Sequence, residues 1–104
     1  MPQLDVCRLQ TRGRKKFGER LVVVLQSDVP ADLATRLVAP LEDALQVPGI
    51  KHVRPEVLLE GRRRSVIVDQ TSTIRVRDIA EVVGSVREAG DRIKRAFDWT
   101  YFGV

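Results

Sequence analysis

The sequence predicts an α+β domain, a small SH3-like barrel or strongly bent antiparallel sheet followed by a C-terminal α-helix. Short segments of β character, separated by turn signals, occupy the first three quarters of the chain. After residue 85 the spacing of apolar residues changes to that of a helix. The length of 104 residues suits a single core, so we expect one domain over residues 1–104.

The first strands are predicted from apolar and β-branched content. Residues 4–9 have β character, and residues 20–26 are apolar on both faces, which indicates a buried central strand. Residues 36–41 read as another strand, in which Pro40 removes a ladder donor. Pro40 therefore predicts a strand end or an edge position.

A hairpin is predicted in the middle of the chain, after a turn at residues 47–49. Its strands are residues 56–59 and 65–69, joined by a glycine-bearing basic turn at residues 60–64. Residues 73–76 form a further short strand.

Two capping-box spacings lie close together, Asp78 with Glu81 and Ser85 with Glu88. They predict a short helix or turn and then a long terminal helix, in which Gly90 would cost about 1 kcal/mol relative to Ala. An apolar stripe typical of core packing follows the helical period. Its members are Val86, Ala89, Ile93, Ala96, Phe97, Thr100 and Tyr101. Tyr101 is expected in the core or in a dimer interface.

The composition, 43% hydrophobic and 31% charged, is that of a globular protein. The longest apolar run, residues 21–25, is too short for a membrane span, and the N-terminus lacks a basic segment followed by an apolar stretch. We therefore expect a cytoplasmic protein that does not contact membranes. Cys7 and His52 stand alone, which excludes an internal disulfide and argues against a metal site, and we expect no cofactor. Cys7 is expected to serve in packing.

The net charge of +4 suits an acidic partner, either a nucleic acid or an acidic polypeptide, although many small basic proteins bind no polyanion. Two clusters carry much of the positive charge. They are Arg12, Arg14, Lys15 and Lys16 in a glycine-bearing loop, and Arg62, Arg63 and Arg64 in the hairpin turn.

Four blocks of sequence carry a resemblance to a known family. They read RLVVVLQSD at residues 20–28, RLVAPL at 36–41, IKRAF at 93–97 and YFGV at 101–104. In this order and spacing they cover nearly the whole chain, which resembles the CcdB family of bacterial toxin–antitoxin toxins.

The resemblance implies a barrel-like sheet with a C-terminal helix, similar to the fold of the Kid and MazF ribonuclease toxins, assembled as a symmetric homodimer. It also implies a toxin that binds the A subunit of DNA gyrase and traps the complex with cleaved DNA. An antitoxin with an acidic disordered segment removes such toxins. Nucleic acid is then contacted only indirectly, through gyrase or the operon complex.

In the family the last three residues, Trp-Gly-Ile, insert into gyrase, and Phe102, Gly103 and Val104 occupy these positions here. With Phe102 in place of Trp, the indole N–H is absent. A cation–π contact, worth about 0.5 to 2 kcal/mol with aromatic rings in general, is weaker with a phenyl ring than with an indole. Trp99, one turn earlier, compensates only if it points the same way. The alternative is that Phe102 and Val104 fold over their own core or lie at the dimer interface.

The resemblance gives the basic clusters two readings, either solvated loops that maintain solubility or contacts to an acidic antitoxin segment or to DNA phosphates at gyrase. Two other functions stay open. One is an endoribonuclease that uses His52 with a nearby Asp and Arg for acid–base chemistry. The other is a non-toxic relative that acts only with an antitoxin in autoregulation.

Overall fold

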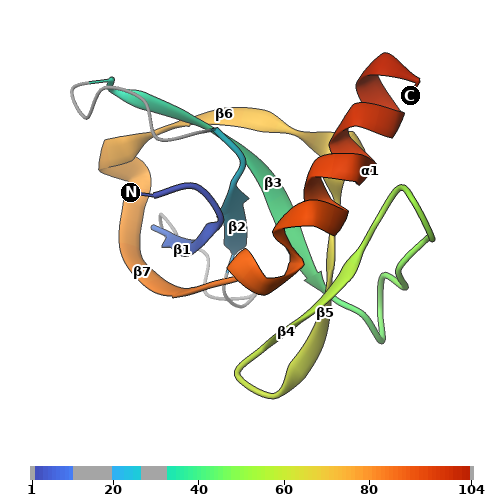
Figure 1. Ribbon diagram of the computed structural model, residues 1–104. Helices are drawn as coiled ribbons and strands as arrows, with labels where there is room; N and C mark the ends of the chain where they lie inside the picture. Colours follow the sequence, from blue (N-terminus) through green and yellow to red (C-terminus); the bar gives the residue numbers. More distant parts are fainter. Residues whose placement is uncertain (1, 11–19, 27–32, 104) are drawn as a thin grey trace.

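The computed structural model describes residues 2–10, 20–26 and 33–103, which form a curled antiparallel sheet crossed by one long helix (Figure 1). The strands are β1 Asp5–Leu9, β2 Leu21–Val24, β3 Thr35–Asp43, β4 Glu56–Leu59, β5 Arg62–Val66, β6 Ser72–Arg75 and β7 Ile79–Ser85. The short 3₁₀ helices η2 Val68–Gln70, η3 Val76–Asp78 and η4 Arg87–Ala89 precede or link these elements, and α1 Gly90–Phe102 ends the described chain.

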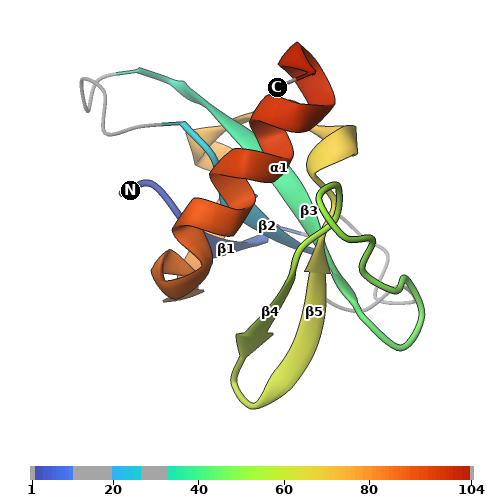
Figure 2. The same ribbon diagram turned by 45° about the vertical axis from the view of Figure 1, so that its right-hand side comes forward.

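The seven-stranded sheet has the order β4-β5-β3-β2-β1-β7, and β6 pairs with β3 outside this path. The long strand β3 has two partners along one edge, because Thr35 to Val38 pair with β6 and Leu41 to Asp43 pair with β5. The sheet curls into a half-barrel, with α1 lying across it (Figure 2). The predicted α+β class, with a bent antiparallel sheet and a C-terminal helix, is confirmed.

Strand β2 is buried along its whole length, as its apolar sequence predicts. Leu21 and Val23 face the main core, whereas Val22 and Val24 join a second cluster on the other face with Val38. Cys7 belongs to the second cluster and is fully buried, so its expected packing role is confirmed. Because both faces of β2 are covered, its sequence is continuously apolar rather than alternating.

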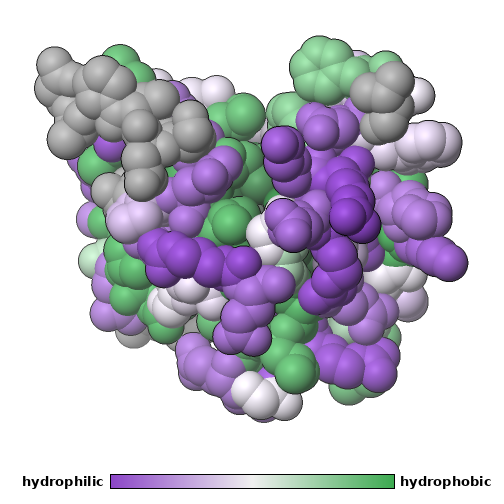
Figure 3. Space-filling view, viewed as in Figure 1, coloured by the Kyte–Doolittle hydropathy of each residue, from purple (hydrophilic) through white to green (hydrophobic). Residues whose placement is uncertain are grey.

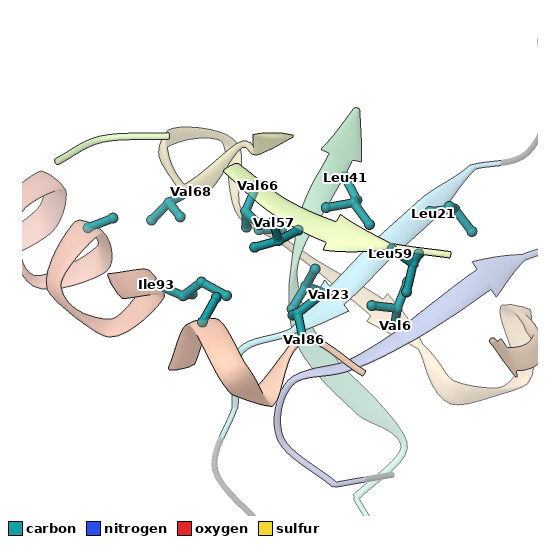
Figure 4. Close-up of a cluster of buried hydrophobic side chains, with 13 residues drawn as sticks. Val6, Leu21, Val23, Leu41, Val57, Leu59, Val66, Val68, Val86 and Ile93 are labelled. Atoms are coloured by element: carbon teal, nitrogen blue, oxygen red, sulfur yellow. The ribbon is translucent and has the colours of Figure 1, made fainter. Parts of the chain in front are cut away.

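The main core lies between α1 and the concave face of the sheet (Figure 4). From the predicted helical stripe, Val86, Ala89, Ile93 and Ala96 are buried, and Ile93 is only 2% exposed. Opposite them lie side chains from β1, β2, β4 and β5, including Val6, Val23, Val57 and Val66. This contact fixes α1 on the sheet.

The position predicted for Pro40 is wrong. Pro40 lies inside β3, opposite Val22 of the neighbouring strand β2. Its carbonyl accepts a hydrogen bond from the N–H of Ile67 at 2.9 Å, so its missing donor also faces that side, away from β2. On that side Pro40 faces the segment between β5 and β6, which belongs to neither of these strands. The missing N–H of Pro40 therefore costs the sheet no ladder hydrogen bond.

The first predicted helix start is also wrong, because residues 79–85 form β7, an outer strand paired with β1. Both proposed capping residues bind elsewhere. The carboxylate of Asp78 accepts a hydrogen bond from Arg75 at 2.8 Å, and Glu81 forms an ion pair with Arg8 of β1 at 3.0 Å. The β-branched residues of this segment and pairing with a distant strand outweigh the local capping signal.

The second capping box is not used as predicted either. The hydroxyl of Ser85 accepts a hydrogen bond from the N–H of Arg87 at 3.4 Å, and η4 leads into α1 at Gly90. Gly90 is thus the first residue of the helix, where the interior penalty for glycine does not apply. A Cβ there would lie 3.0 Å from Leu4.

The hairpin is confirmed, but its turn is shorter than predicted. Glu60 and Gly61, with φ of 53° and 75°, form a two-residue turn of the kind that suits antiparallel strands. Arg62, Arg63 and Arg64 are therefore residues of β5, paired with Leu59, Leu58 and Val57 of β4. Past Val66 the chain leaves the strand and enters η2, so the predicted strand end at residue 69 is too late.

No helix in the described parts of the chain has the length and apolar character that crossing a bilayer requires.

Removal of the Ile93 side chain beyond Cβ tests the role of the α1 contact. Because Ile93 is almost fully buried, Ile93→Ala should lower the free energy of unfolding by about 3 kcal/mol, measured by urea denaturation. Lys94→Ala, at the next and exposed position, should change it by less than about 0.5 kcal/mol. Equal small changes for both variants would contradict this packing.

Candidate functional site at the end of α1

The last turn of α1 carries large apolar side chains into solvent. Phe102 is 69% exposed and Trp99 is 55% exposed. We call Trp99, Phe102 and Gly103 the aromatic tip. In the space-filling view hydrophobic surface is visible at the end of α1 (Figure 3).

The helix beneath the aromatic tip is held in place by Tyr101. Its hydroxyl lies 2.9 Å from the carbonyl oxygen of Val68, to which it donates, and 2.9 Å from the hydroxyl of Thr71. Its ring packs on Phe97, with centroids 4.8 Å apart, and Phe97 in turn packs against the main core. Tyr101 is still 44% exposed, so it lies at the edge of the core rather than inside it. Its alternative place in a dimer interface stays a prediction.

Gly103 ends the helix in the left-handed conformation, with φ of 72°. Its N–H donates to the carbonyl of Trp99 at 3.1 Å, which caps the last turn. Apart from its neighbours in the chain, no described residue has an atom within 4 Å of the place where a Cβ would stand, so glycine is favoured here by conformation rather than by crowding. Val104 lies outside the described residues.

The two rings of the aromatic tip turn toward different neighbours. Trp99 faces the loop before β4, where its ring centroid lies 6.4 Å from that of His52. Phe102 lies 6.4 Å from the ring of Phe97. Trp99 therefore covers the loop side of the helix end, and Phe102 the other side.

A groove of about 410 Å³ opens between this loop, residues 49–56, and α1. We call it the basic groove, because its lining includes five cationic or imidazole side chains. They are Lys51, His52, Arg54, Arg92 and Arg95.

The loop wall of the basic groove is a tight, internally bonded turn. The N–H groups of Val53 and Arg54 both donate to the carbonyl of Ile50, at 3.0 and 2.7 Å. At the apex His52 adopts φ of 70°, a conformation uncommon for a residue with a side chain. The loop thus presents Lys51 and His52 to solvent from a fixed base.

Arg54 forms a bidentate pair with Asp69 of η2, with Nε···Oδ1 and Nη2···Oδ2 distances of 2.8 and 2.9 Å. The hydrogen bonds from Arg54 lower the pKa of Asp69 and, reciprocally, raise that of the guanidinium. The pair ties the loop to the segment that leaves β5. Of the predicted grouping of His52 with an Arg and an Asp, the structure places His52 and Arg54 in the same groove, but the guanidinium of Arg54 is bound to Asp69.

The structure separates the cations that the sequence groups together. Arg62, Arg63 and Arg64 alternate along β5, and Arg63 pairs with Glu56 at 3.2 Å. Nε of Arg64 is buried and has no hydrogen-bond partner within the described chain. Arg12, Arg14, Lys15 and Lys16 lie outside the described residues.

The sequence reasoning missed the basic groove altogether. Neither the helix residues Arg92 and Arg95 nor Lys51 of the loop belongs to the basic clusters predicted from the sequence. The available signal was the spacing of Arg92, Arg95 and Trp99, which places them along one side of a helix.

Neither the thiol nor a metal centre offers a catalytic site in the described part of the chain. Burial, and secondarily the charge of Asp5, raise the pKa of the Cys7 thiol, which disfavours the reactive thiolate. No three His, Cys, Asp or Glu side chains among the described residues are placed to hold a metal ion.

Comparison with known proteins places this geometry in a family. The family model described as CcdB protein matches residues 3–103. The chain belongs to the CcdB family. The resemblance seen in the four sequence blocks is thereby confirmed. A comparison with curated protein sequences found no match.

Solved structures with a similar fold include two toxins. One is described as an endoribonuclease in complex with its cognate antitoxin from Mycobacterial species. It has a TM-score of 0.78 and 13% identity, and the alignment covers 100% of this chain and 96% of that one. The other is the Mycobacterium tuberculosis toxin MazF-mt6, with a TM-score of 0.70, 21% identity and coverage of 94% and 96%. Sequence identities this low show that this CcdB family protein shares the fold of the two toxins, and nothing more.

The Arg54–Asp69 pair predicts acid sensitivity. Asp69 stays ionised in the folded protein at pH values where the unfolded chain binds a proton, so stability rises with pH in that range. The contribution is complete above about pH 5 and is lost progressively as pH falls further. Unfolding followed between pH 5 and pH 2 should show a shallower fall in stability for Asp69→Asn than for the wild type.

Arg54→Gln should flatten the same pH dependence, because it removes the partner that keeps Asp69 ionised. Identical pH profiles for the wild type and both variants would show that the pair makes no such contribution.

Proposed function

We propose that this CcdB family protein is the toxin of a toxin–antitoxin system and acts by docking its aromatic tip on the A subunit of DNA gyrase, trapping the complex with cleaved DNA. Family membership supports the toxin assignment. The observation that carries the mode of action is the 69% exposure of Phe102 at the end of a firmly anchored helix.

Docking through this helix end is physically favourable. Aromatic side chains bring a large contact area with few rotatable bonds, and a few such residues dominate most interfaces. Tyr101 and the Gly103 cap hold the last turn in place before binding, which lowers the entropic cost of ordering it. Large apolar side chains left in solvent otherwise favour aggregation, so their exposure indicates use.

Phe102 in place of the family's Trp sets an expectation for affinity. A phenyl ring has no N–H to donate and attracts a cation less strongly than an indole ring. Trp99 turns toward the basic groove and His52, so it does not substitute for the lost indole at the tip. We therefore propose weaker gyrase binding than a Trp at position 102 would give.

We further propose that the protein acts in the cytoplasm as a homodimer and is neutralised by an antitoxin with an acidic disordered segment. The net charge of +4 suits such a partner. One of the solved structures of this fold is a complex with a cognate antitoxin. The candidate contacts are the two clusters predicted from sequence, Arg62, Arg63 and Arg64 together with Arg12, Arg14, Lys15 and Lys16.

Gyrase supercoiling and cleavage assays test the role of the aromatic tip. Deletion of residues 102–104 should abolish gyrase poisoning while the fold and antitoxin binding survive, and Phe102→Ala should weaken poisoning at least tenfold, roughly the loss of one interface hot spot. Phe102→Trp should strengthen it, because the indole restores the N–H and the better cation–π face.

Leu58→Ala supplies the matched control, because Leu58 on β4 is also 69% exposed but lies on a different element. It should leave poisoning unchanged. Full poisoning by the truncated chain, or equal loss in Leu58→Ala and Phe102→Ala, would refute docking through the tip.

Ribonuclease activity is the second candidate function, favoured by the fold shared with the endoribonuclease structure. His52 is its candidate acid–base residue, exposed beside Trp99. One observation argues against ribonuclease activity. Two N–H donors of the nearby Arg54 guanidinium are already bound to Asp69.

We expect RNA to stay intact when it is incubated with the wild-type protein at high concentration in the absence of gyrase. RNA cleavage by the wild type that disappears in His52→Ala would instead establish the ribonuclease function. His52→Gln, which keeps a polar side chain of similar size, controls for disruption of the loop.

A further inference from the structure

We propose that the basic groove binds a single-stranded nucleic acid, with its cations on backbone phosphates and Trp99 against a base. This goes beyond the proposed docking on gyrase and does not depend on it. The residues that carry it come from two separate elements, the loop 49–56 and α1.

Positive charge in the groove is largely uncompensated. Glu56 is the acidic residue in its lining, and its carboxylate already accepts from the N–H of Gly49 at 3.0 Å and pairs with Arg63 at 3.2 Å. Arg54 is neutralised by Asp69. Lys51 and Arg95 are exposed, and neither side chain forms an ion pair or a hydrogen bond with another described residue. An anion entering the groove therefore meets at least two available cations.

Arg92 is positioned for the same ligand. One Nη of its guanidinium donates to the carbonyl of Glu56 at 2.8 Å, which holds the planar group at the groove wall. The remaining N–H donors suit the oxygens of a phosphate, which guanidinium groups bind with defined geometry.

Two aromatic rings lie beside the cations: His52 lines the groove, and Trp99 lies next to His52, just outside the lining. Trp99 is half-exposed, and the His52 ring beside it is tilted by 46° at 6.4 Å, so the two rings do not cover each other's faces. Trp99 follows Arg92 by seven residues, which places it on the same side of α1 about 10 Å further along the axis. Cations followed by open ring faces match a phosphate backbone whose bases can stack.

This arrangement favours a single strand over the other polyanions. An acidic polypeptide would satisfy the cations but has no general use for the ring faces. In a duplex the bases are paired and stacked, so they cannot lie on Trp99. A single strand offers phosphates and free bases together.

Fluorescence anisotropy with a labelled ten-nucleotide uridine-rich RNA, and with the DNA of matching sequence, tests the site at rising salt. The wild type should bind, with affinity falling as salt increases. Arg95→Glu should weaken binding at least tenfold and reduce the salt slope by about 0.7. Trp99→Ala should weaken binding about tenfold and leave the salt slope unchanged. Stronger binding of the RNA than of the DNA would add a 2′-hydroxyl contact to the site.

Lys94→Glu is the matched control. It makes the same change in net charge at the neighbouring helix position, but Lys94 lines a different groove on the other side of α1, with Leu4 and Phe97. It should bind like the wild type, and circular dichroism should show all variants folded.

Equal losses for Lys94→Glu and Arg95→Glu would overturn the proposal, since net charge alone would then explain binding. The absence of oligonucleotide binding, together with binding of poly-glutamate that Arg95→Glu abolishes, would overturn it in favour of an acidic protein partner. Because no gyrase is present, neither result bears on docking through the aromatic tip.

Discussion

The packing of one helical stripe on the concave face of the sheet is the contact on which the other features of this protein depend. Ile93 and Ala96 are buried in one cluster with side chains from five strands, β1 to β5, and this fixes both the position and the rotation of α1. The direction in which each exposed residue of α1 faces is then fixed as well. The aromatic tip lies beyond the sheet because α1 extends further than the core on which it packs (Figure 1). The basic groove forms because another side of the same helix faces the loop 49–56.

A single helix thereby carries three surfaces of different chemistry. Its buried side is apolar, its loop side is cationic, and its end is aromatic and exposed. Such separation lets one surface change without loss of the others, because substitutions on the exposed sides leave the packed stripe intact. Trp99 lies where the cationic side meets the helix end, beside His52. A substitution at Trp99 therefore affects both the aromatic tip and the edge of the basic groove.

A shared fold does not by itself decide the chemistry of a protein. The chain belongs to the CcdB family, while solved structures that share its fold include an endoribonuclease. A common sheet and helix can support both, because activity resides in the side chains placed on the scaffold rather than in the scaffold. In this chain the one histidine lies on an exposed turn, and the adjacent Arg and Asp are engaged with each other. By contrast, the exposed side chains at the end of α1, Trp99 and Phe102, contribute little to the packing of the protein itself.

The sequence by itself determined the elements whose signals are local. The continuous apolar run of β2, the hairpin with its glycine-bearing turn and the helical stripe around Ile93 could all be predicted, because each depends on neighbours a few residues away. So was the aromatic tip as a candidate site, from residues at the chain end.

Only the tertiary structure decided the features that depend on distant partners. β7 is a strand because β1 offers it an edge, whatever its capping signals indicate locally. Pro40 is tolerated inside β3 because its missing donor faces the interval between two partner strands. The basic groove exists because a loop near residue 52 and a helix near residue 95 are brought together, and no spacing along the chain encodes that distance.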